Sequence, residues 1–455
     1  MNNDYHLIGI GGIGMSGIAR LLLRLGNTVS GSDLKENKEI LTLRHLGAKV
    51  YIGHSKENLT GSPTVIYSSA IKEDNPEVLE AKRLKLPLLK RAQALATLMA
   101  DKTVIAVAGS HGKTTTASLA SYLLLEAGLQ PTVAVGGILK NLDANACFGC
   151  GKFFVAEADE SDGSFLYYKP DYSIITNIDY EHLDYYKGFD NILKAFRDFF
   201  DATRTNGKIF CCSQDASLMQ IAKDYKDKVI SFGLSSGADI YPKNIAFNGL
   251  KSEFDCFFKD KFVSRFTLGL AGEHNISNAL AVVALGITLG IDTKVISSAL
   301  SGYKGAGRRL DLKFKDDNYT ILDDYAHHPT EIKATLKALS YLEAKRRIVI
   351  FQPHRYTRTK FLFDEFTKSF NQADILFITD IYPAAEEPIS GVDSRKLSLA
   401  IKEFNKDKAV YYTLKDEVVE RVIELLKPKD LVITLGAGDI SKLSDELAER
   451  LKSKE

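Results

Sequence analysis

The sequence has few cysteines and no excess of charge of either sign. Only five of its 455 residues are cysteine, and a sparse, odd-numbered set suits a reducing compartment better than a disulfide framework. Cys147 and Cys150 form a single CxxC pair with no second pair at metal-binding spacing, so we assign them to packing or a loop. Lys and Arg number 59 against 58 Asp and Glu, and this balance argues against nucleic acid or an anionic membrane as partner.

Long hydrophobic runs are missing as well. The longest apolar stretch lies near residues 279–290 and is shorter than the roughly 20 residues that span a bilayer. The chain opens with MNNDYHLIGI, polar and then strand-like, which is unlike a secretory signal peptide. We therefore expect a cytoplasmic protein of about three domains.

Short apolar runs typical of strands alternate with amphipathic helical patterns along the chain. This alternation predicts an α/β protein whose parallel sheets are covered by helices. The expected strands include 7–10, 103–108, 153–156, 172–177, 348–352, 375–380 and 431–435. Boundaries are expected near residue 100 and near 302–308, within GYKGAGRR, so the predicted domains are 1–100, 101–305 and 306–455.

The first candidate site is the glycine-rich turn Gly9-Ile-Gly11-Gly12-Ile-Gly14, which follows an expected strand and precedes an expected helix. Glycine lets backbone N–H groups approach a phosphate. The carboxylate of Asp33, at the end of the next strand, can accept hydrogen bonds from ribose hydroxyls. By itself the motif is typical of an NAD site. A dinucleotide fold usually needs two halves, however, and only about 100 residues precede the next loop. We predict a nucleotide site and leave the nucleotide open.

A second glycine-rich loop is more specific. In TVIAVAGSHGKTTTASLASYLL a strand, a loop and a helix follow one another, so Lys113 can reach β- and γ-phosphates and Thr114 can hold Mg²⁺. The usual motif has glycine at position 107, where this sequence has valine, and its glycines are Gly109 and Gly112. The strand–loop–helix context nonetheless predicts a phosphate loop for ATP.

Acidic residues follow two further expected strands, in FFVAEADESDGSF and TNIDYEHLDYY. Carboxylates at strand ends near a phosphate loop are the usual partners of Mg²⁺. His182 is an unusual ligand for Mg²⁺, so Mn²⁺ could also serve. For any single carboxylate, a solvated acidic loop is the alternative interpretation.

Two asparagines open the segment GEHNISNALAVVALG. Asn275 and Asn278 are three residues apart on a helical pattern, so they share a face and can present amides to a nucleotide base. An asparagine that caps a core helix explains the same pattern, and the residues alone favour this second interpretation.

Arginines mark the last third of the chain. Two of them follow an expected strand and can direct guanidinium groups at a carboxylate or phosphate. Two more lie at the second domain boundary, where a hinge can bring them to a γ-phosphate. In sequence order the four are Arg308, Arg309, Arg355 and Arg358. Between the pairs, Pro329 after His327-His328 is well placed to open a helix.

Together these segments resemble the Mur ligase family. They run in family order from residue 9 to residue 359: GIGGIGMSGIA, AGSHGKTTT, EADESDGSF, TNIDYEHLDYY, EHNISNALA, GRR, DDYAHHPTEI and QPHRYTRT. The resemblance implies a three-domain α/β architecture. A Rossmann-like N-terminal domain would bind UDP, a central P-loop ATPase domain would have a mostly parallel sheet, and a Rossmann-like C-terminal domain would close over the amino-acid substrate.

The resemblance also implies site residues. ATP would be bound by Gly109, Ser110, His111, Gly112, Lys113, Thr114, Thr115, Asn275, Asn278, Arg309 and Asp324. The UDP-sugar would be bound by Gly11, Gly12, Ile13, Gly14, Asp33, Ser69, His111 and Asn177. The metal ligands would be Thr114, Glu157 and His182, with Glu160 close enough to Glu157 to leave that choice open, and the substrate end would hold His327, Arg355 and Arg358. The implied catalytic residues are Lys113, Glu157, His182, Arg309 and His327.

The implied reaction is ATP-dependent amide formation in peptidoglycan synthesis. The lactyl carboxylate of UDP-N-acetylmuramate would attack the γ-phosphate, and the amine of L-alanine would attack the resulting acyl phosphate. Mg²⁺ would be the cofactor, no nucleic acid or membrane would take part, and the chain would be a monomer or weak homodimer. A recycling ligase of the same family, which adds a tripeptide, remains the alternative. Two other classes of function explain less of the sequence. An NAD-dependent dehydrogenase would account for the first glycine loop but not for the phosphate loop. A non-enzymatic nucleotide sensor would account for both loops but not for the acidic residues and arginines.

Overall fold

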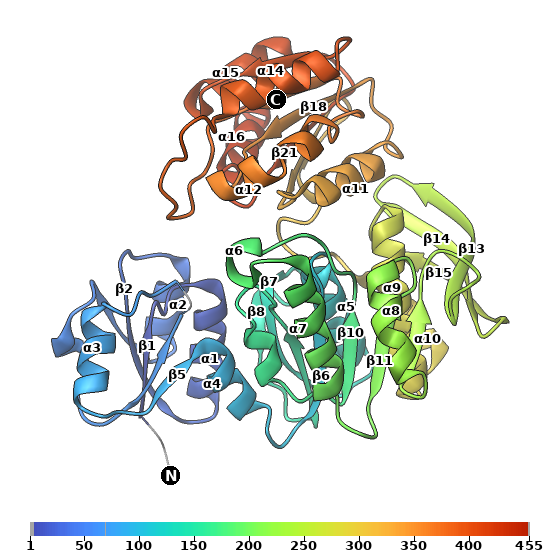
Figure 1. Cartoon of the computed structure of the whole chain (residues 1–455). Coiled ribbons are helices and arrows are strands. Elements are labelled where there is room, and N and C mark those ends of the chain that lie inside the picture. Colours follow the sequence, from blue (N-terminus) through green and yellow to red (C-terminus); the bar gives the residue numbers. More distant parts are fainter. Residues whose placement is uncertain (1–3, 69, 454–455) are drawn as a thin grey trace. The chain divides into compact units, whose positions relative to one another are not determined.

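Three sheets follow one another along the chain, each with its own helices (Figure 1). The computed structural model describes residues 4–68 and 70–453. By compactness the chain divides into one unit of Met1–Asn244, Phe254–Thr267 and Ser277–Lys304, and a second of Ile245–Glu253, Leu268–Ile276 and Gly305–Glu455. Among the described residues, no helix is long and apolar enough to cross a membrane.

The first sheet has five parallel strands in the order β3-β2-β1-β4-β5. Its elements are β1 Asp4–Ile8, α1 Ile13–Arg24, β2 Thr28–Asp33, α2 Lys38–His45, β3 Lys49–Ile52, η1 Lys56–Asn58, β4 Thr64–Tyr67, α3 Pro76–Arg83, β5 Leu88–Lys90 and α4 Arg91–Leu98. The strand order reverses between β1 and β4, and ligands of such sheets bind beyond the strand ends at this point. The first glycine loop comes directly after β1 and therefore lies there.

The second sheet has ten strands in the order β15-β14-β13-β12-β11-β10-β6-β9-β7-β8. The strands are β6 Thr103–Ala108, β7 Thr132–Leu139, β8 Ala144–Cys147, β9 Phe153–Glu157, β10 Tyr172–Ile175, β11 Lys208–Cys212, β12 Val229–Phe232, β13 Ile240–Asn248, β14 Lys251–Phe258 and β15 Lys261–Leu268. The helices are α5 Lys113–Glu126, η2 Ser164–Tyr167, α6 Leu183–Tyr186, α7 Phe189–Ala202, α8 Ala216–Ala222, η3 Lys223–Tyr225, α9 Glu273–Thr288 and α10 Thr293–Gly302. The pairs from β7 through β9, β6, β10 and β11 to β12 are parallel, and β8 is antiparallel to β7.

The position of β6 decides where the site of this sheet forms. β6 lies between β9 and β10 and pairs parallel with both. Its residues from Val104 to Ala108 are at most 1% exposed, as expected of a central parallel strand covered on both faces. The carboxyl ends of β6, β9 and β10 therefore meet at one edge, where the phosphate loop, Glu157 and Asn177 are found.

The third sheet has the strand order β16-β17-β21-β18-β19-β20, with β16 antiparallel and the other pairs parallel. Its elements are β16 Asp311–Lys315, β17 Tyr319–Asp324, α11 Pro329–Leu339, β18 Arg346–Phe351, α12 Tyr356–Phe361, α13 Phe363–Thr367, β19 Ile375–Ile378, α14 Ser394–Phe404, β20 Ala409–Tyr412, α15 Lys415–Leu425, β21 Asp430–Leu435 and α16 Ser441–Lys452. Leu322 and Val349 pack into one core with α11 and α14, while Ile321 and Ile348 pack into another with α15 and α16. Because strand side chains alternate, helices cover both faces.

The expected strands agree with the observed ones to within two residues at each end, except for the first. The strand expected at 7–10 is β1, Asp4–Ile8, because the chain turns at Gly9. There φ is +79°, and the N–H groups of Gly9 and Ile10 both donate to the carbonyl of Ser32, at 2.8 and 3.0 Å. The domain limits expected near residues 100 and 305 fall between successive sheets.

Candidate active site

The phosphate loop joins β6 to α5. Gly109 and Gly112 have φ of +125° and +82°, a region that glycine adopts without strain. A Cβ at Gly112 would lie 2.7 Å from Oδ1 of Asn278, so a side chain at this position would have to displace that amide. The first-turn N–H groups of α5 have no partners within the helix and, with the helix dipole, form a binding site for phosphate.

Lys113 is the first residue of α5, and its ammonium group points back over the loop. Nζ donates to the carbonyl oxygens of Gly109 (2.6 Å) and Ser110 (3.3 Å) and to Oε1 of Glu160 (2.9 Å). Burial lowers the pKa of Lys113, but the surrounding carboxylates, Glu160 foremost, outweigh burial and hold the pKa above its ordinary value. Lys113 is therefore a fixed cation beside the first turn of α5, where the sequence predicts a phosphate site.

Glu160 is a buried carboxylate with a side chain that is 2% exposed. Burial raises the pKa of Glu160 to about 7, against the pull of Lys113. Its Oε1 lies 3.7 Å from Nε2 of His182, and its Oε2 has no hydrogen-bond partner among the described residues. Glu181 lies 3.7 Å from the same histidine nitrogen, and the ligand atoms of the three residues lie within 4.8 Å of one another. Such a group can hold a divalent cation.

Glu157 ends β9 and faces the first turn of α5. The hydroxyl of Thr114 lies 3.1 Å from both carboxylate oxygens of Glu157, and the N–H of Gly136 donates to Oε2 at 2.7 Å. Hydroxyl and carboxylate oxygens are the hard ligands that Mg²⁺ prefers. The structure therefore separates the two glutamates: Glu157 lies beside Thr114, and Glu160 lies beside His182.

The segment after β10 holds the phosphate loop in shape. Asn177 accepts the N–H of His111 at Oδ1 (2.8 Å), donates to the His111 carbonyl (3.1 Å) and accepts the N–H of Ser110 at its own carbonyl (3.0 Å). Asp179 donates its N–H to the hydroxyl of Ser110 at 2.8 Å, and its carboxylate lies 2.9 Å from Nε2 of His111. Asn177, which the resemblance assigns to the sugar nucleotide, thus binds the loop backbone.

The carboxylate of Asp33 holds the backbone of the first glycine loop in place. The carboxylate of Asp33 accepts the N–H of Gly11 at 2.8 Å and that of Leu34 at 2.8 Å. Gly12 caps α1, and Ile13 and Gly14 form its first turn. Ser69, also expected at this site, lies outside the described residues.

The two asparagines belong to α9 and are buried. The helix begins at Glu273, ahead of both, so the interpretation of an asparagine N-cap is wrong. Asn278 lies against Gly112 of the phosphate loop. Asn275 donates from Nδ2 to the carbonyl of Ala271 at 2.7 Å. The asparagines therefore help to position the start of this helix through side-chain contacts.

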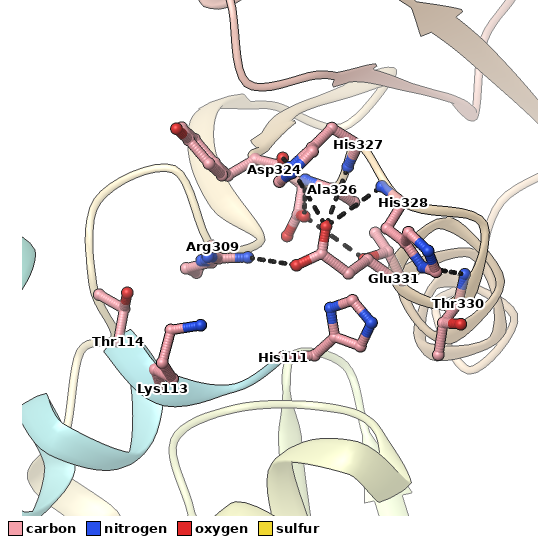
Figure 2. A network of polar contacts seen from close by, with 12 residues as sticks. His111, Lys113, Thr114, Arg309, Asp324, Ala326, His327, His328, Thr330 and Glu331 are labelled. Atoms are coloured by element: carbon pink, nitrogen blue, oxygen red, sulfur yellow. Dashed lines mark hydrogen bonds and ion pairs between the residues drawn. The ribbon is translucent and has the colours of Figure 1, made fainter. Parts of the chain in front are cut away.

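In the second unit, polar groups gather around Glu331 of α11 (Figure 2). Pro329 opens this helix as expected, with His328 as N-cap. Oε2 of Glu331 accepts the N–H groups of His327 (3.1 Å) and His328 (3.3 Å), and Oε1 lies 3.5 Å from Nη1 of Arg309. One carboxylate thus holds Arg309 and His327 together.

Asp324, the last residue of β17, is a second buried carboxylate in this cluster. It accepts the N–H groups of Leu310 (2.7 Å) and Ala326 (2.8 Å). Burial raises the pKa of Asp324 to about 6, and the guanidinium of Arg309 opposes this rise. Asp324 therefore orders the turns on both sides of the cluster. With its pKa at about 6, its carboxyl group is protonated at mildly acidic pH.

The neighbouring Arg308 has a different environment from Arg309. Its guanidinium donates to Asp323 at 2.9 Å and to the carbonyls of Gly436 (2.5 Å) and Gly438 (3.0 Å). These contacts tie the ends of β17 and β21 together. Arg308 is therefore engaged within the second unit, and the expectation that the two arginines reach a γ-phosphate stays a prediction.

Arg355 and Arg358 stand at the start of α12, after β18. Nη1 of Arg358 lies 3.2 Å from Nδ1 of His354, and the His354 ring lies 5.7 Å from the ring of His327. Nη1 of Arg355 lies 4.0 Å from Glu386. Burial and then the neighbouring cations lower the pKa of His354 to about 3, so its ring is neutral near pH 7. Two guanidinium groups and two imidazoles thus meet at one end of the sheet.

Comparison with known proteins identifies the family. Three family models match in order: the Mur ligase family catalytic domain at residues 4–103, the Mur ligase middle domain at 107–286, and the Mur ligase glutamate ligase domain at 308–438. The chain belongs to the Mur ligase family. The three-domain α/β architecture expected from the resemblance is confirmed.

Relatives of this Mur ligase match it along nearly its whole length. The UDP-N-acetylmuramate–L-alanine ligase of Aquifex aeolicus (strain VF5) is 46% identical over 448 residues, covering 98% of this chain and 97% of its own. The enzyme of that name from Syntrophus aciditrophicus (strain SB) is 44% identical over 450 residues, covering 99% and 94%. The crystal structure of UDP-N-acetylmuramate–alanine ligase from Thermotoga maritima is similar with a TM-score of 0.85 at 29% identity, covering 99% of this chain and 100% of that one.

The structure of this Mur ligase brings many of the expected site residues together and adds others. Lys113, Thr114 and Glu157 lie side by side, as the strand order requires. The sequence analysis missed Glu331 and His354. A signal for Glu331 was present, because it stands three residues after the N-cap His328, the position of the glutamate in a capping box. His354 precedes Arg355 directly, but nothing local indicates that its ring lies near that of His327.

Proposed function

We propose that this chain joins L-alanine to the lactyl carboxylate of UDP-N-acetylmuramate and converts ATP to ADP and phosphate, a step of peptidoglycan precursor synthesis. Relatives named UDP-N-acetylmuramate–L-alanine ligase support the substrates at 44–46% identity. The observation that carries the proposal is the extent of this match, 98–99% of the chain, because a shared phosphate loop alone would not identify the acceptor or the amine.

The phosphate loop provides the ATP site in this proposal. The first-turn amides of α5 bind the phosphates, and the ammonium of Lys113 stabilises the charge that develops as the γ-phosphoryl group is transferred. Its hydrogen bonds to two loop carbonyls keep this cation in place before ATP arrives. The other proposed ATP contacts are Gly109, Ser110, His111, Gly112, Thr114, Thr115, Asn275, Asn278, Arg309 and Asp324.

The donors around the loop fit Mg²⁺. Thr114 and Glu157 offer hard oxygen ligands, and the buried Oε2 of Glu160, which has no described partner, offers another beside His182. When bound, Mg²⁺ neutralises charge on the phosphates. The imidazole of His182 would suit Mn²⁺ as well. Chelation with EDTA should abolish phosphate release, and either Mg²⁺ or Mn²⁺ should restore it.

The proposed chemistry has two steps. A lactyl carboxylate oxygen attacks the γ-phosphorus, which forms an acyl phosphate and releases ADP. The amine of L-alanine then attacks the acyl carbon, loses a proton, and expels phosphate. His327, Arg355 and Arg358 would receive the amino acid, whose carboxylate suits a guanidinium fork. The UDP-sugar would lie along Gly11, Gly12, Ile13, Gly14 and Asp33, with Ser69, His111 and Asn177 as further contacts.

The decisive experiment measures phosphate release from MgATP with UDP-N-acetylmuramate, with and without L-alanine. We expect release only when both substrates are present, and a product heavier by one alanine residue in mass spectrometry. Turnover with L-Ala-D-Glu-meso-diaminopimelate but not with L-alanine would instead identify a tripeptide recycling ligase. No turnover with either amine would contradict both.

We propose that the enzyme works in the cytoplasm as a monomer or weak homodimer, without a nucleic acid or membrane partner. The five cysteines are unbridged, which suits a reducing compartment. Cys147 is the last residue of β8 and Cys150 lies in the following loop, as suits a packing or loop role. Sedimentation velocity at several concentrations would determine the oligomeric state.

A further inference from the structure

Asp215 is an acidic residue that none of the glycine-rich or acidic motifs includes. It lies three residues beyond the end of β11 and is the N-cap of α8. One carboxylate oxygen, Oδ1, accepts the N–H of Leu218 at 2.8 Å, as the side chain of an N-cap residue does. The other oxygen, Oδ2, accepts the N–H of Ile178 at 2.6 Å. The carboxylate therefore joins the start of α8 to the segment that follows β10.

This segment, residues 176–182, belongs to neither a helix nor a strand. Because β10 pairs parallel with β6 on one side and with β11 on the other, the segment leaves the sheet between the phosphate loop and the turn that carries Asp215. Its backbone lies directly against the phosphate loop, since a Cβ at Gly109 would lie 2.9 Å from the carbonyl oxygen of Asn177. The segment thus has the phosphate loop on one side and Asp215 on the other.

Ile178 stands between two residues that hold the phosphate loop. Asn177 exchanges hydrogen bonds with both backbone groups of His111, at 2.8 and 3.1 Å, and the N–H of Asp179 donates to the hydroxyl of Ser110 at 2.8 Å. These contacts hold the loop in one shape only while the segment itself is fixed. Fixing a segment without regular structure costs conformational entropy, and a hydrogen bond to a carboxylate offsets this cost better than a neutral one.

We propose that Asp215 is a positioning residue of the ATP site. It fixes the N–H of Ile178 so that Asn177 and Asp179 hold the phosphate loop in the shape that binds ATP. This inference rests on the proposed function and adds to it a residue that acts through the segment 176–182 and does not touch ATP. Without this bond, ATP has to order the segment as it binds, and the cost of ordering lowers its affinity.

Asp215→Asn tests the proposal in the full-length protein. Asparagine caps helices as well as aspartate does, so α8 keeps its N-cap. With Oδ1 toward Leu218, the side-chain amide presents N–H donors to the N–H of Ile178 and cannot accept its bond. Calorimetry with MgATP should show an affinity about 10-fold lower, as expected for loss of a hydrogen bond to a charged group. The KM for ATP should rise by the same factor while kcat stays within about threefold, because bound ATP orders the loop again.

Hydrogen exchange read by mass spectrometry separates a role at the ATP site from a role in α8 alone. In Asp215→Asn without nucleotide, the amides of residues 109–112 should exchange faster than in the unmodified protein, and saturating MgATP should remove the difference. Asp292→Asn is the matched control, because Asp292 caps α10 in the same unit and accepts the N–H of Lys294 at 2.7 Å. It should change neither the affinity for ATP nor the exchange of the phosphate loop.

Two outcomes would overturn the proposal. One is an unchanged affinity for ATP in Asp215→Asn. The other is a lower kcat at unchanged KM with faster exchange confined to residues 213–222, a pattern that indicates fewer folded molecules and a correctly held loop. If Asp215→Asn does not fold, Asp215→Ser decides the question, because serine is a good N-cap but has a single side-chain oxygen. Failure of the proposed function is a different result, in which the unmodified protein releases no phosphate with either amine.

Discussion

The ion pair between Lys113 and Glu160 couples the activity of this enzyme to its stability. Lys113→Met keeps most of the side-chain stem but removes the ammonium, with its bonds to Gly109, Ser110 and Glu160. Loss of a preorganised charge at a transferring phosphoryl group should lower kcat by about 100- to 1,000-fold or more. The structure predicts a further cost, in the stability of the first unit.

That cost arises because Glu160 is 2% exposed and would lose its cation. Removing one partner of a buried ion pair costs about 3–5 kcal/mol, and uptake of a proton by Glu160 places the cost at the lower end. A large protein of two units need not unfold in one step, so the melting temperature of the first unit is the suitable measure. At about 2–4 °C per kcal/mol, a loss of about 3 kcal/mol lowers Tm by about 6–12 °C.

Calorimetric melts and phosphate release, measured on the same preparations, check both parts. The double variant Lys113→Met/Glu160→Gln should recover most of the lost Tm, because a neutral amide needs no cation, yet it should stay inactive. Lys82→Met is the control in the same unit: its ion pair with Glu73 is 47% and 85% exposed, so Tm should change by no more than about 2 °C. Near-normal turnover by Lys113→Met would refute the phosphate-loop assignment. An unchanged Tm would refute the argument about the buried pair.

Three more predictions concern a glycine, an arginine and an acid. Gly112→Ala puts a Cβ 2.7 Å from Oδ1 of Asn278 at a φ of +82°, so calorimetry should show weaker ATP binding and a lower Tm. Arg308→Ala removes the guanidinium from Asp323, which is fully buried, and should destabilise the second unit by about 3 kcal/mol or more in thermal melts, with partial recovery in Arg308→Lys. The pKa of Asp324 is raised from 3.8 to about 6, so its contribution to stability is present at low pH and is lost as pH rises through about 6. Asp324→Asn should flatten this slope between pH 4 and pH 6 in melts, and equal slopes would count against the buried carboxylate.

Features that depend on a few consecutive residues could be predicted from the sequence. The glycines of both loops mark turns with positive φ, and strand, loop and helix follow in the order that their apolar patterns indicate. Pro329 was expected to open a helix because its fixed φ and missing N–H suit the first turn, and α11 begins there. Such preferences are local, so no knowledge of distant contacts was needed.

Other features needed the pairing of distant segments. Glu157 and Glu160 are three residues apart and equally acidic in the sequence. The register of β9 on β6 sets Val107 opposite Glu157, which brings Glu157 to Thr114, whereas Glu160 lies beyond the strand and meets Lys113 and His182. No local pattern distinguishes these two environments, because each partner belongs to another strand or loop.

The same division holds in the second unit. The sequence by itself determined that two arginines follow the domain boundary and that an acidic strand end precedes the histidines. Only the tertiary structure decided that Arg308 has a φ of +59° and ties β17 to β21, while Arg309 turns to Glu331. Residue types and spacing specify which groups are present and the local turns that carry them. Burial, charge pairing and the choice between neighbouring residues follow from sheet topology, since they depend on contacts between segments that lie far apart in the chain.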